Sequence, residues 1–433
     1  MFRLICWIAA LSLASAVCAQ TVPAFPPEEF SEHTERRVSL GQLLFYDPIL
    51  SGNRNIACAT CHHPKFATSD GVSLALGEGG KGLGPDRIGT PDNMPEERIA
   101  RNAPALFNLG AAQFTTMFHD GRLEADPTRA SGIRTPLADT MAIGFDSVLS
   151  AQAMFPVLSG DEMAGHYSES DVSQAVRQGF LSSEGGAWDI IAARVSGIPE
   201  YRTKFDDVIG TRDIEFTDIA NVIASFIAIE WRADNSPFDQ FLLGGALSDD
   251  VLAGLELFYG KAGCADCHTG RFQTDHDFHA IAMPQIGPGK SARFEPHHRD
   301  TGRMRVTGDP ADAYRFRTPS LRNIALTGPY GHDGAYRDLE AVVRHHLDPI
   351  ASLNAYAPGQ AVFPDFEAND WSIMNAPDEI AAIAAANDLL PVGLTDPEVQ
   401  NLLAFLRALT DSAGGKGQLG VPESVPSGLT VDR

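Results

Sequence analysis

The sequence has few cysteines, few basic residues and no long apolar run beyond its first residues. Of the six cysteines in 433 residues, Cys6 and Cys18 lie in the N-terminal segment, and the other four fall within two copies of one short pattern. No cysteine is left over for a structural disulfide. The stability of the fold therefore has to come from a hydrophobic core and from bound groups.

Basic residues are outnumbered, with 33 Lys and Arg against 56 Asp and Glu and a formal net charge of -23. This charge makes nucleic acid and anionic membrane surfaces poor partners. The charge is compatible with a basic partner protein, and equally with an acidic surface that only keeps the protein in solution. After the N-terminal segment no apolar run reaches the roughly 20 residues of a membrane span, so we expect no membrane-spanning helix.

The N-terminal segment has the pattern of a cleaved secretory signal peptide. Arg3 is followed by an apolar run, and small residues stand near Ala19. This pattern predicts a signal peptide over 1–19 and export to the periplasm. A lipoprotein signal ending at Cys18 is the alternative, but Val17 occupies the position where a small residue is expected.

The four remaining cysteines lie in two Cys-x-x-Cys-His motifs, at 58–62 and 264–268. Two thiols and an adjacent imidazole in this spacing attach a c-type haem and ligate its iron. A zinc knuckle or a thioredoxin-like dithiol is the alternative, but the first does not explain the adjacent His and the second expects a βαβ setting. The sequence therefore predicts two covalently bound c-type haems. The predicted attachment and iron-ligating residues are Cys58, Cys61, His62, Cys264, Cys267 and His268.

Each motif follows a predicted helix and precedes a long loop, so the two halves of the chain share one plan. Apolar residues at helical spacing predict helices over 29–45 and 251–258, before the two motifs, and Ser248 resembles an N-cap for the second. Two further helices, over 217–231 and 399–409, are predicted at the ends of the halves.

Strand patterns are few, and the 40 glycines and 28 prolines populate the long loops. The predicted fold class is mainly α, with two cytochrome c-like haem domains and long irregular loops. We expect an N-terminal domain over 28–235 and a C-terminal domain over 236–412, each with one haem. The tail over 413–433 is rich in Gly, Pro and Ser and is predicted to be disordered.

Three further blocks combine with the haem motifs: Phe-His-Asp-Gly-Arg at 118–122, Phe-Arg-Thr-Pro-Ser-Leu-Arg-Asn at 316–323, and Pro-Tyr-Gly-His-Asp-Gly at 329–334. Together they resemble the bacterial di-haem cytochrome c peroxidase and MauG family over roughly 40–409. The resemblance implies a haem peroxidase, an oxidoreductase with hydrogen peroxide as acceptor. In such proteins the N-terminal haem reacts with peroxide and the C-terminal haem transfers electrons.

The resemblance also implies a distal ligand for the C-terminal haem. The family places a Met or a Tyr at a fixed step beyond the Pro-Tyr-x-His-Asp-Gly block, and in this sequence that step falls on His346. An iron ligated by His268 and His346 is six-coordinate and low-spin, with a lower potential than a His/Met site. His345 and Met304 remain alternatives.

For the N-terminal haem the expected proximal ligand is His62. Conventional family members carry an inhibitory distal His in the glycine-rich loop that here spans 76–82, but this chain has no His between Pro64 and Phe118. We therefore expect an open iron.

The family's distal Gln, Pro and Glu match Gln152, Pro156 and Glu162 in their mutual spacing. The resemblance implies that one group transfers protons while the others hold peroxide as the O–O bond breaks. A solvated helix face is the alternative for Glu162.

The chain departs from the family in two places. The segment over 123–151 is longer than the usual link, which makes it an insertion that could shape a partner surface or a substrate gate. The Trp that bridges the haems in family members is His119 here, and a surface Trp of MauG is Ala262. Imidazole is harder to oxidise than indole, so His119 is a less certain electron relay and could instead be hydrogen-bonded between the cofactors.

The family also binds Ca²⁺ between its domains through a side-chain amide and two carbonyl oxygens, a hard-oxygen site completed by water. The matching residues are Asn102, Thr327 and Pro329. A simple loop-capping role is the alternative for Asn102.

Three functions fit this resemblance. A MauG-like or MbnH-like enzyme would use peroxide to bring both haems to a high-valent state that oxidises Trp or Tyr side chains of a partner protein. A conventional cytochrome c peroxidase would reduce peroxide to water with electrons from a small cytochrome or cupredoxin, and an electron-transfer protein would have no substrate of its own. The missing distal His and Met favour the first over the second, and Gln152 with Glu162 counts against the third. The expected partners are hydrogen peroxide and a small periplasmic protein that serves as electron donor or substrate.

Overall fold

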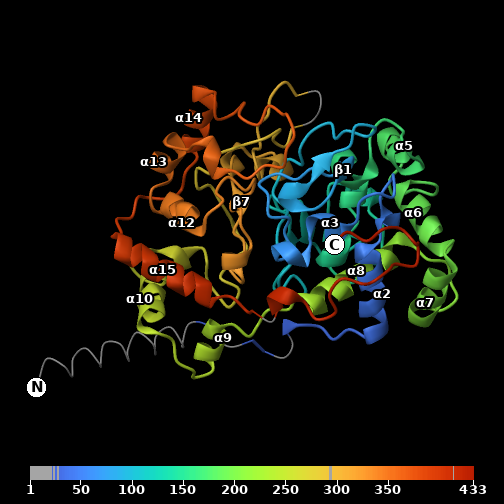
Figure 1. Ribbon diagram of the computed structural model, residues 1–433, viewed down its shortest axis with the longest axis horizontal. Helices are drawn as coiled ribbons and strands as arrows, with labels where there is room; N and C mark the ends of the chain where they lie inside the picture. Colours follow the sequence, from blue (N-terminus) through green and yellow to red (C-terminus); the bar gives the residue numbers. More distant parts are fainter. Residues whose placement is uncertain (1–21, 23–24, 27–28, 292–294, 413) are drawn as a thin grey trace, which may run out of the picture.

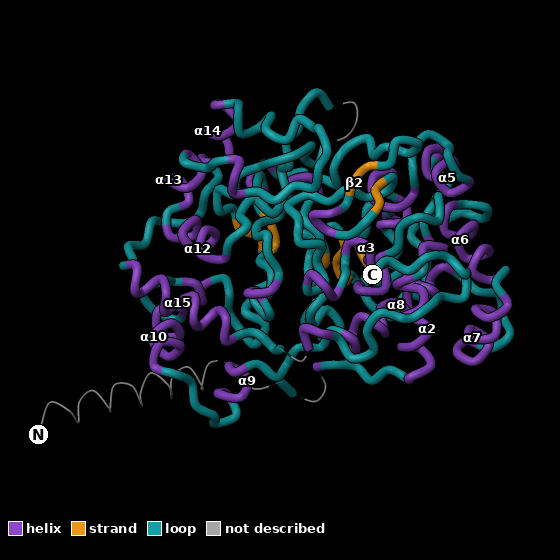
Figure 2. The backbone as a smooth tube through the Cα atoms, in the orientation of Figure 1, coloured by secondary structure: helices purple, strands orange, loops and turns teal. Residues whose placement is uncertain are grey.

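The computed structural model describes Val22 and residues 25–26, 29–291, 295–412 and 414–433. Helices joined by long loops make up most of it, and strands are few and short (Figure 2). The N-terminal half lies on one side of the molecule and the C-terminal half on the other (Figure 1). In the described part of the chain, no helix is long and apolar enough to cross a membrane. The mainly α prediction is confirmed, whereas the predicted signal peptide over 1–19 lies outside the described residues.

The α-helices have the following bounds: α2 Glu35–Tyr46, α3 Cys58–Cys61, α4 Val148–Gln152, α5 Asp171–Gln178, α6 Ala187–Ser196, α7 Pro199–Ile209, α8 Phe216–Glu230, α9 Pro237–Leu242, α10 Asp249–Phe258, α11 Met304–Thr307, α12 Leu339–Leu347, α13 Pro349–Asn354, α14 Pro377–Ala385 and α15 Asp396–Ala408. The strands are β1 Gly80–Lys81, β2 Ile88–Gly89, β3 Thr116–Met117, β4 Leu123–Ala125, β5 Ile133–Arg134, β6 Phe278–His279 and β7 Phe316–Arg317. They form three small antiparallel sheets, β1-β2, β3-β4-β5 and β6-β7.

The same helix crossing occurs once in each half. In the N-terminal half α2 packs on α8, and a Cβ at Gly41 would collide with the Val222 carbonyl and the Phe226 side chain. In the C-terminal half α10 packs on α15, and a Cβ at Gly254 would collide with the Asn401 carbonyl and with Phe405. In both crossings the glycine faces a Phe and the residue four positions before that Phe. A glycine is needed there because only a missing side chain lets the two backbones approach so closely.

These four helices are the ones predicted from apolar spacing. The predicted 251–258, 217–231 and 399–409 segments agree with α10, α8 and α15 to within a few residues. The first predicted helix, over 29–45, begins late, at Glu35, but ends as predicted before Asp47-Pro48. In both halves the helix before the haem motif therefore packs on the helix that closes that half.

Aromatic side chains join the two halves. Phe272, from the C-terminal half, is buried within the main core of the N-terminal half. Its ring lies 5.1 Å from that of Phe114 and 5.0 Å from that of Phe25. Buried aromatic rings contribute large apolar area together with specific edge contacts, so this cluster fixes how the halves meet.

A buried ion network crosses the same boundary. Arg101 Nε lies 2.6 Å from Asp300 Oδ2, and Arg101 Nη1 lies 2.7 Å from Asp120 Oδ2. Arg98 pairs with Asp370 at 3.0 Å. Removing one partner of such a pair leaves a buried charge and costs about 3–5 kcal/mol, so these pairs hold the relative position of the halves strongly.

The tail over 413–433 was predicted to be disordered, and the structure contradicts this. From 414 onward it returns from α15 to the N-terminal half and runs along it (Figure 1). Val425 is buried in the N-terminal core, and the Glu230 carboxylate accepts hydrogen bonds from the backbone N–H groups of Leu419 (2.7 Å) and Gly420 (2.9 Å). Asp432 accepts a hydrogen bond at 2.7 Å from Thr60, inside the first haem motif.

The physical reason lies in apolar residues spaced four apart. Val421, Val425 and Leu429 all pack on the N-terminal core, although Gly, Pro and Ser separate them. Composition alone indicates a segment that cannot form its own core, but a tail can still dock on a core that another segment has built.

The insertion over 123–151 forms a compact piece of structure. Its strands β4 and β5 extend β3 into a three-stranded sheet beside the Phe118–Arg122 block, and it ends in α4. The insertion therefore leads directly into Gln152, the last residue of α4.

Candidate functional site

The second haem motif opens onto a cavity of about 600 Å³. This volume lies within the range of about 300–1,000 Å³ that is typical of small-molecule and cofactor sites. Its walls are largely apolar and include Phe258, Leu321, Val343 and Leu402. The cavity brings together nine residues singled out in the sequence: Asn102, His119, Gln152, Cys264, Cys267, His268, Thr327, Pro329 and His346.

Two imidazoles face each other in this cavity. The ring centres of His268 and His346 are 6.4 Å apart. Two imidazoles that ligate one metal ion from opposite sides have ring centres about 6 Å apart, because each metal–nitrogen bond is about 2.0 Å long. His268 Nδ1 donates to the Gln273 carbonyl at 3.0 Å, and His346 Nδ1 donates to the Val342 carbonyl at 2.8 Å. Both Nε2 atoms are thereby left to act as metal ligands, the usual arrangement for ligating histidines.

His345 points elsewhere. Its Nδ1 bonds to the Tyr336 hydroxyl at 3.0 Å and its Nε2 to the Ile281 carbonyl at 2.7 Å. Both ring nitrogens are therefore occupied. Met304, at the start of α11, is not among the residues that line the cavity. Of the three predicted candidates for the distal ligand, only His346 therefore lines the cavity.

The first haem motif forms α3, packed beneath α2. His62 Nδ1 donates to the Thr68 carbonyl at 2.9 Å, as His268 Nδ1 does to the Gln273 carbonyl, so Nε2 is the nitrogen that would ligate iron. Burial raises the pKa of the Cys58 and Cys61 thiols to about 12.

Glu162 lies within electrostatic reach of this motif. Burial and the Asp70 carboxylate are the main causes that raise the pKa of the Cys61 thiol, and the Glu162 carboxylate adds to them. Burial also raises the pKa of Glu162 itself, although Lys290 and Arg122 oppose this. A carboxyl group with a raised pKa can accept and return a proton near neutral pH, as acid–base catalysis requires.

Gln152, Pro156 and Glu162 lie on consecutive short elements. Gln152 ends α4, Pro156 begins the 3-10 turn Pro156–Leu158, and Glu162 lies in the π-helical turn Gly160–Ala164. The Gln152 Oε1 atom is buried and has no hydrogen-bond partner among the described residues. An unpaired buried amide oxygen is costly, which fits a group whose partner is a bound molecule.

The glycine-rich loop over 76–82 packs next to these residues and is firmly held. Glu78 is buried, and its Oε1 accepts hydrogen bonds from Asn53, Asn55 and Asn93 at 2.7–2.8 Å. The backbone N–H of Glu78 donates to the Asp161 carbonyl at 3.0 Å. The loop is thus anchored beside Glu162 and carries no imidazole.

His119 lines the cavity between the two halves. Burial, together with the neighbouring charges of Arg101 and Arg317, holds the pKa of His119 well below its ordinary value. The ring is therefore neutral at physiological pH. Its backbone carbonyl accepts a hydrogen bond at 2.8 Å from the Arg317 N–H, which ties the Phe118–Arg122 block to β7.

The residues predicted to bind Ca²⁺ border the same cavity. The Asn102 amide donates from Nδ2 to the Val72 carbonyl at 2.8 Å, which orients the amide and leaves Oδ1 available as an oxygen ligand. Thr327 and Pro329 flank Gly328, so their carbonyl groups lie close together in the chain. An amide oxygen with two carbonyls is the kind of donor set that Ca²⁺ accepts.

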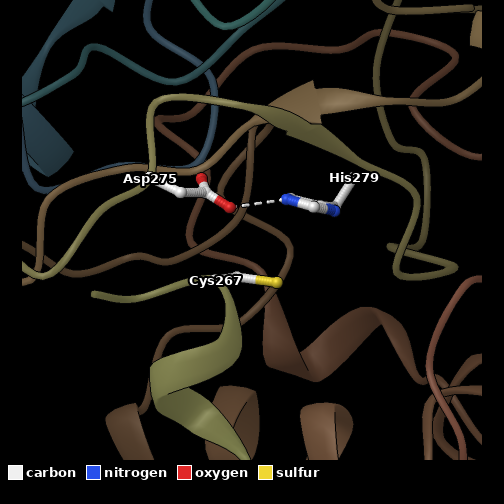
Figure 3. A group of neighbouring side chains, drawn as sticks. All are labelled: Cys267, Asp275 and His279. Atoms are coloured by element: carbon white, nitrogen blue, oxygen red, sulfur yellow. Dashed lines mark hydrogen bonds and ion pairs between the residues drawn. The ribbon is translucent and has the colours of Figure 1, made fainter.

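Cys267, Asp275 and His279 form a further group whose ligand atoms lie within 4.8 Å of one another (Figure 3). His279 Nε2 bonds to Asp275 Oδ2 at 2.8 Å. Cys267, however, belongs to the second haem motif, and a sulfur in a thioether link to haem carries no thiolate charge. We therefore assign the Asp275–His279 pair to the rim of the haem site.

Paired histidines in an apolar cavity, two Cys-x-x-Cys-His motifs and a mainly helical two-part fold define a di-haem c-type protein. A model of the family described as di-haem cytochrome c peroxidase matches residues 35–246. The methylamine utilization protein MauG of Methylorubrum extorquens is 32% identical over 321 residues, 72% of this chain and 69% of that protein. The chain belongs to the di-haem cytochrome c peroxidase and MauG family, and it is a haem peroxidase, an oxidoreductase that acts on peroxide.

Two further comparisons cover more of the chain. Cytochrome c551 peroxidase of Nitrosomonas europaea is 28% identical over 344 residues, 78% of this chain and 80% of that protein. The crystal structure of a MauG-like protein associated with microbial copper homeostasis superimposes with a TM-score of 0.57 at 26% identity, covering 91% of this chain and 94% of the other. Family membership implies two c-type haems, and the His62 and His268 rings, each held through Nδ1 by a backbone carbonyl, fit a role as iron ligands.

Sequence reasoning missed two charged residues near the site. Arg317 lies inside the Phe-Arg-Thr-Pro block but received no role, and Lys290 lies in a loop without any motif. The second became recognisable only in the fold, where it approaches Glu162 from the other half of the chain.

Proposed function

We propose that this chain is a MauG-like enzyme of the periplasm, in which hydrogen peroxide reacts at an open N-terminal haem and the oxidising equivalents remove electrons from Trp or Tyr side chains of a partner protein. The reaction consumes one H₂O₂, two protons and two electrons and yields two H₂O. Each electron comes from an aromatic side chain of the partner, which is thereby oxidised. The haems supply the redox chemistry, and the chain's own residues supply the binding and proton-transfer steps.

One observation carries the proposal: the anchored glycine-rich loop over 76–82. In conventional members this loop brings a His to the distal side of the N-terminal iron. Here it has no His, and Glu78 fixes it to three asparagines and to the Asp161 carbonyl. Peroxide therefore needs no prior reduction of the enzyme to gain access.

The three distal residues have different roles in the peroxide step. Peroxide has to lose a proton from the oxygen nearer the iron and gain one on the farther oxygen before the bond breaks. Glu162 is the carboxyl group that takes and returns this proton. Gln152 cannot titrate in this range, so its amide holds peroxide through hydrogen bonds, and Pro156 shapes the wall beside it.

His268 and His346 would hold the iron of the C-terminal haem through their Nε2 atoms, and this haem would supply electron-transfer chemistry. His119, neutral and between the halves, occupies the path between the haems. Ca²⁺ bound through Asn102, Thr327 and Pro329 would hold the two halves at a fixed distance.

A conventional cytochrome c peroxidase is the second candidate, favoured by the likeness to cytochrome c551 peroxidase. Its electrons would come from a small cytochrome or cupredoxin, and the same residues would serve the peroxide step. The two candidates differ at the N-terminal iron of the resting enzyme, which would be open in the first and would carry a distal side-chain ligand in the second.

Cyanide binding separates them. We expect cyanide to bind fully to one of the two haems of the oxidised, diferric protein without any reductant, because no side chain has to leave the iron first. The measurement is a titration followed by the Soret absorption, and the haem with two His ligands should stay unchanged as an internal control. Binding that begins only after one-electron reduction would reveal a hidden ligand and favour the conventional peroxidase.

A further inference from the structure

Arg317 is held at the boundary between the halves and lines the 600 Å³ cavity. It ends β7, which pairs with β6 in the C-terminal half. Its Nε donates to the Phe118 carbonyl at 3.2 Å, and its Nη1 donates to the Thr318 carbonyl at 3.3 Å. Among the described residues Nη2 has no hydrogen-bond partner, and the side chain lines the cavity.

Three buried arginines of the described chain are paired with carboxylates, whereas Arg87, also buried, donates to the carbonyls of Leu76, Gly77 and Gly82 and feels the charges of Asp432, Glu78 and Asp70. Arg98 lies 3.0 Å from Asp370, Arg101 lies 2.6 Å from Asp300, and Arg322 lies 2.8 Å from Asp239.

Among the described residues Arg317 has carbonyl partners only. Burial lowers its pKa to about 10, and within the described residues no acidic group counteracts this. For Arg101, by contrast, Asp300 and Asp120 outweigh burial and raise the pKa. A buried guanidinium without an anion is costly, so an anion that is not part of the chain is expected beside Arg317.

A second unpaired group adjoins Arg317. Both ring nitrogens of His276 are buried and have no hydrogen-bond partner among the described residues. Its ring packs edge-on against Phe114, which lines the cavity, with 5.0 Å between ring centres. Burial is the main cause that lowers the pKa of His276, and the charge of Arg317 adds to it, so the two side chains lie close together. The neutral imidazole has one N–H to donate, and this N–H lies near Arg317 just behind the cavity wall.

We propose that Arg317, with His276 beside it, binds a propionate group of the C-terminal haem. A propionate is a carboxylate, and arginine forms paired, charge-assisted hydrogen bonds with carboxylates. The same arginine is tied to Phe118 and His119, which line the cavity from the N-terminal half. The inference rests on the two haems of the family and not on which molecule donates electrons, so it stands or falls separately from the proposed function.

The test is a redox titration of both haems at several pH values between 5 and 8, in wild type and Arg317→Gln. Loss of the positive charge stabilises the ferric form, so the ferric-to-ferrous ratio of the low-spin haem should rise at least tenfold at fixed potential, a decrease of about 59 mV for one electron. The buried propionate should then also titrate in this range, which makes the potential pH-dependent only in the variant. A change of less than threefold, or a shift confined to the high-spin haem, would overturn the assignment.

Arg303→Gln is the matched control. Arg303 donates to the Asp120 and Gly121 carbonyls at 3.2 and 2.9 Å, in the same block that Arg317 contacts, but it has Glu124 as its ion-pair partner. The low-spin potential should stay unchanged in this variant. An equal shift in both variants would show that loosening of the 118–122 block, and not a propionate contact, is responsible.

Arg317→Lys covers the case in which the Gln variant does not fold. A lysine keeps the charge but loses the planar fork, so the propionate-bending band in the resonance Raman spectrum of the C-terminal haem should shift. A band identical to that of wild type would contradict the proposal.

Discussion

His346→Ala should convert the C-terminal haem from a low-spin to a high-spin state while both haems stay covalently attached. His346 Nε2 is free and directed at the cavity, with its ring centre 6.4 Å from that of His268. Losing one of two strong axial ligands leaves a five-coordinate or water-bound iron. Electron paramagnetic resonance of the oxidised protein measures this directly, and conversion of the low-spin signal should be essentially complete.

His345→Ala is the control for this variant. His345 is adjacent in sequence, but both its nitrogens are used by Tyr336 and Ile281. The low-spin signal should therefore remain, while unfolding becomes easier by about 1–3 kcal/mol because a buried hydroxyl and a buried carbonyl lose their partner. If the low-spin signal survives in His346→Ala and disappears in His345→Ala, the ligand assignment is wrong.

Glu162→Gln should slow the reaction of the diferric protein with peroxide by about 10² to 10⁴, the usual contribution of general acid–base catalysis. The amide keeps the shape of the side chain but cannot take or return a proton. Gln152→Ala should slow the reaction less, because it removes an orienting group only. Stopped-flow mixing with peroxide, followed by haem absorbance, gives both rates.

The pH dependence of the wild-type rate has a definite direction. Glu162 acts first as a base, so the reaction needs its carboxylate form, and burial raises the pKa of this group. The rate should therefore fall as the pH decreases through a value above the ordinary carboxyl range, and this fall should be absent in Glu162→Gln. Equal rates and equal pH profiles for the two proteins would remove Glu162 from the mechanism and direct attention to Asp161, Glu124 or Asp126.

The parts of the structure that follow from local patterns were predictable. Apolar residues at helical spacing are a local signal, and the helices α8, α10 and α15 appear where this signal indicates. The resemblance to the family led to His346, because the family places a ligand at a fixed step beyond the 329–334 block. The choice between His345 and His346 needed the structure, because it depends on Tyr336 and on the distant Ile281 carbonyl.

The parts that depend on distant segments were not predictable. The tail looks disordered by composition, yet Val425 docks on a core built some 200 residues or more earlier in the chain. The roles of Arg317 and Lys290 could not be assigned from the sequence, although Arg317 lies in the Phe-Arg-Thr-Pro block. These roles depend on which charged groups the fold places near each side chain. Buried ion pairs such as Arg101 with Asp300 are separated by 199 positions and can be recognised only in three dimensions.

The most direct test of the proposed function is a near-infrared spectrum of the diferric protein after addition of hydrogen peroxide, without any electron donor. A MauG-like enzyme should give a long-lived near-infrared band that arises from charge shared between the two haems and that disappears when an oxidisable partner protein is added. Peroxide that produces no such band, and that is consumed only after the enzyme has first taken up one electron, would contradict the proposed function.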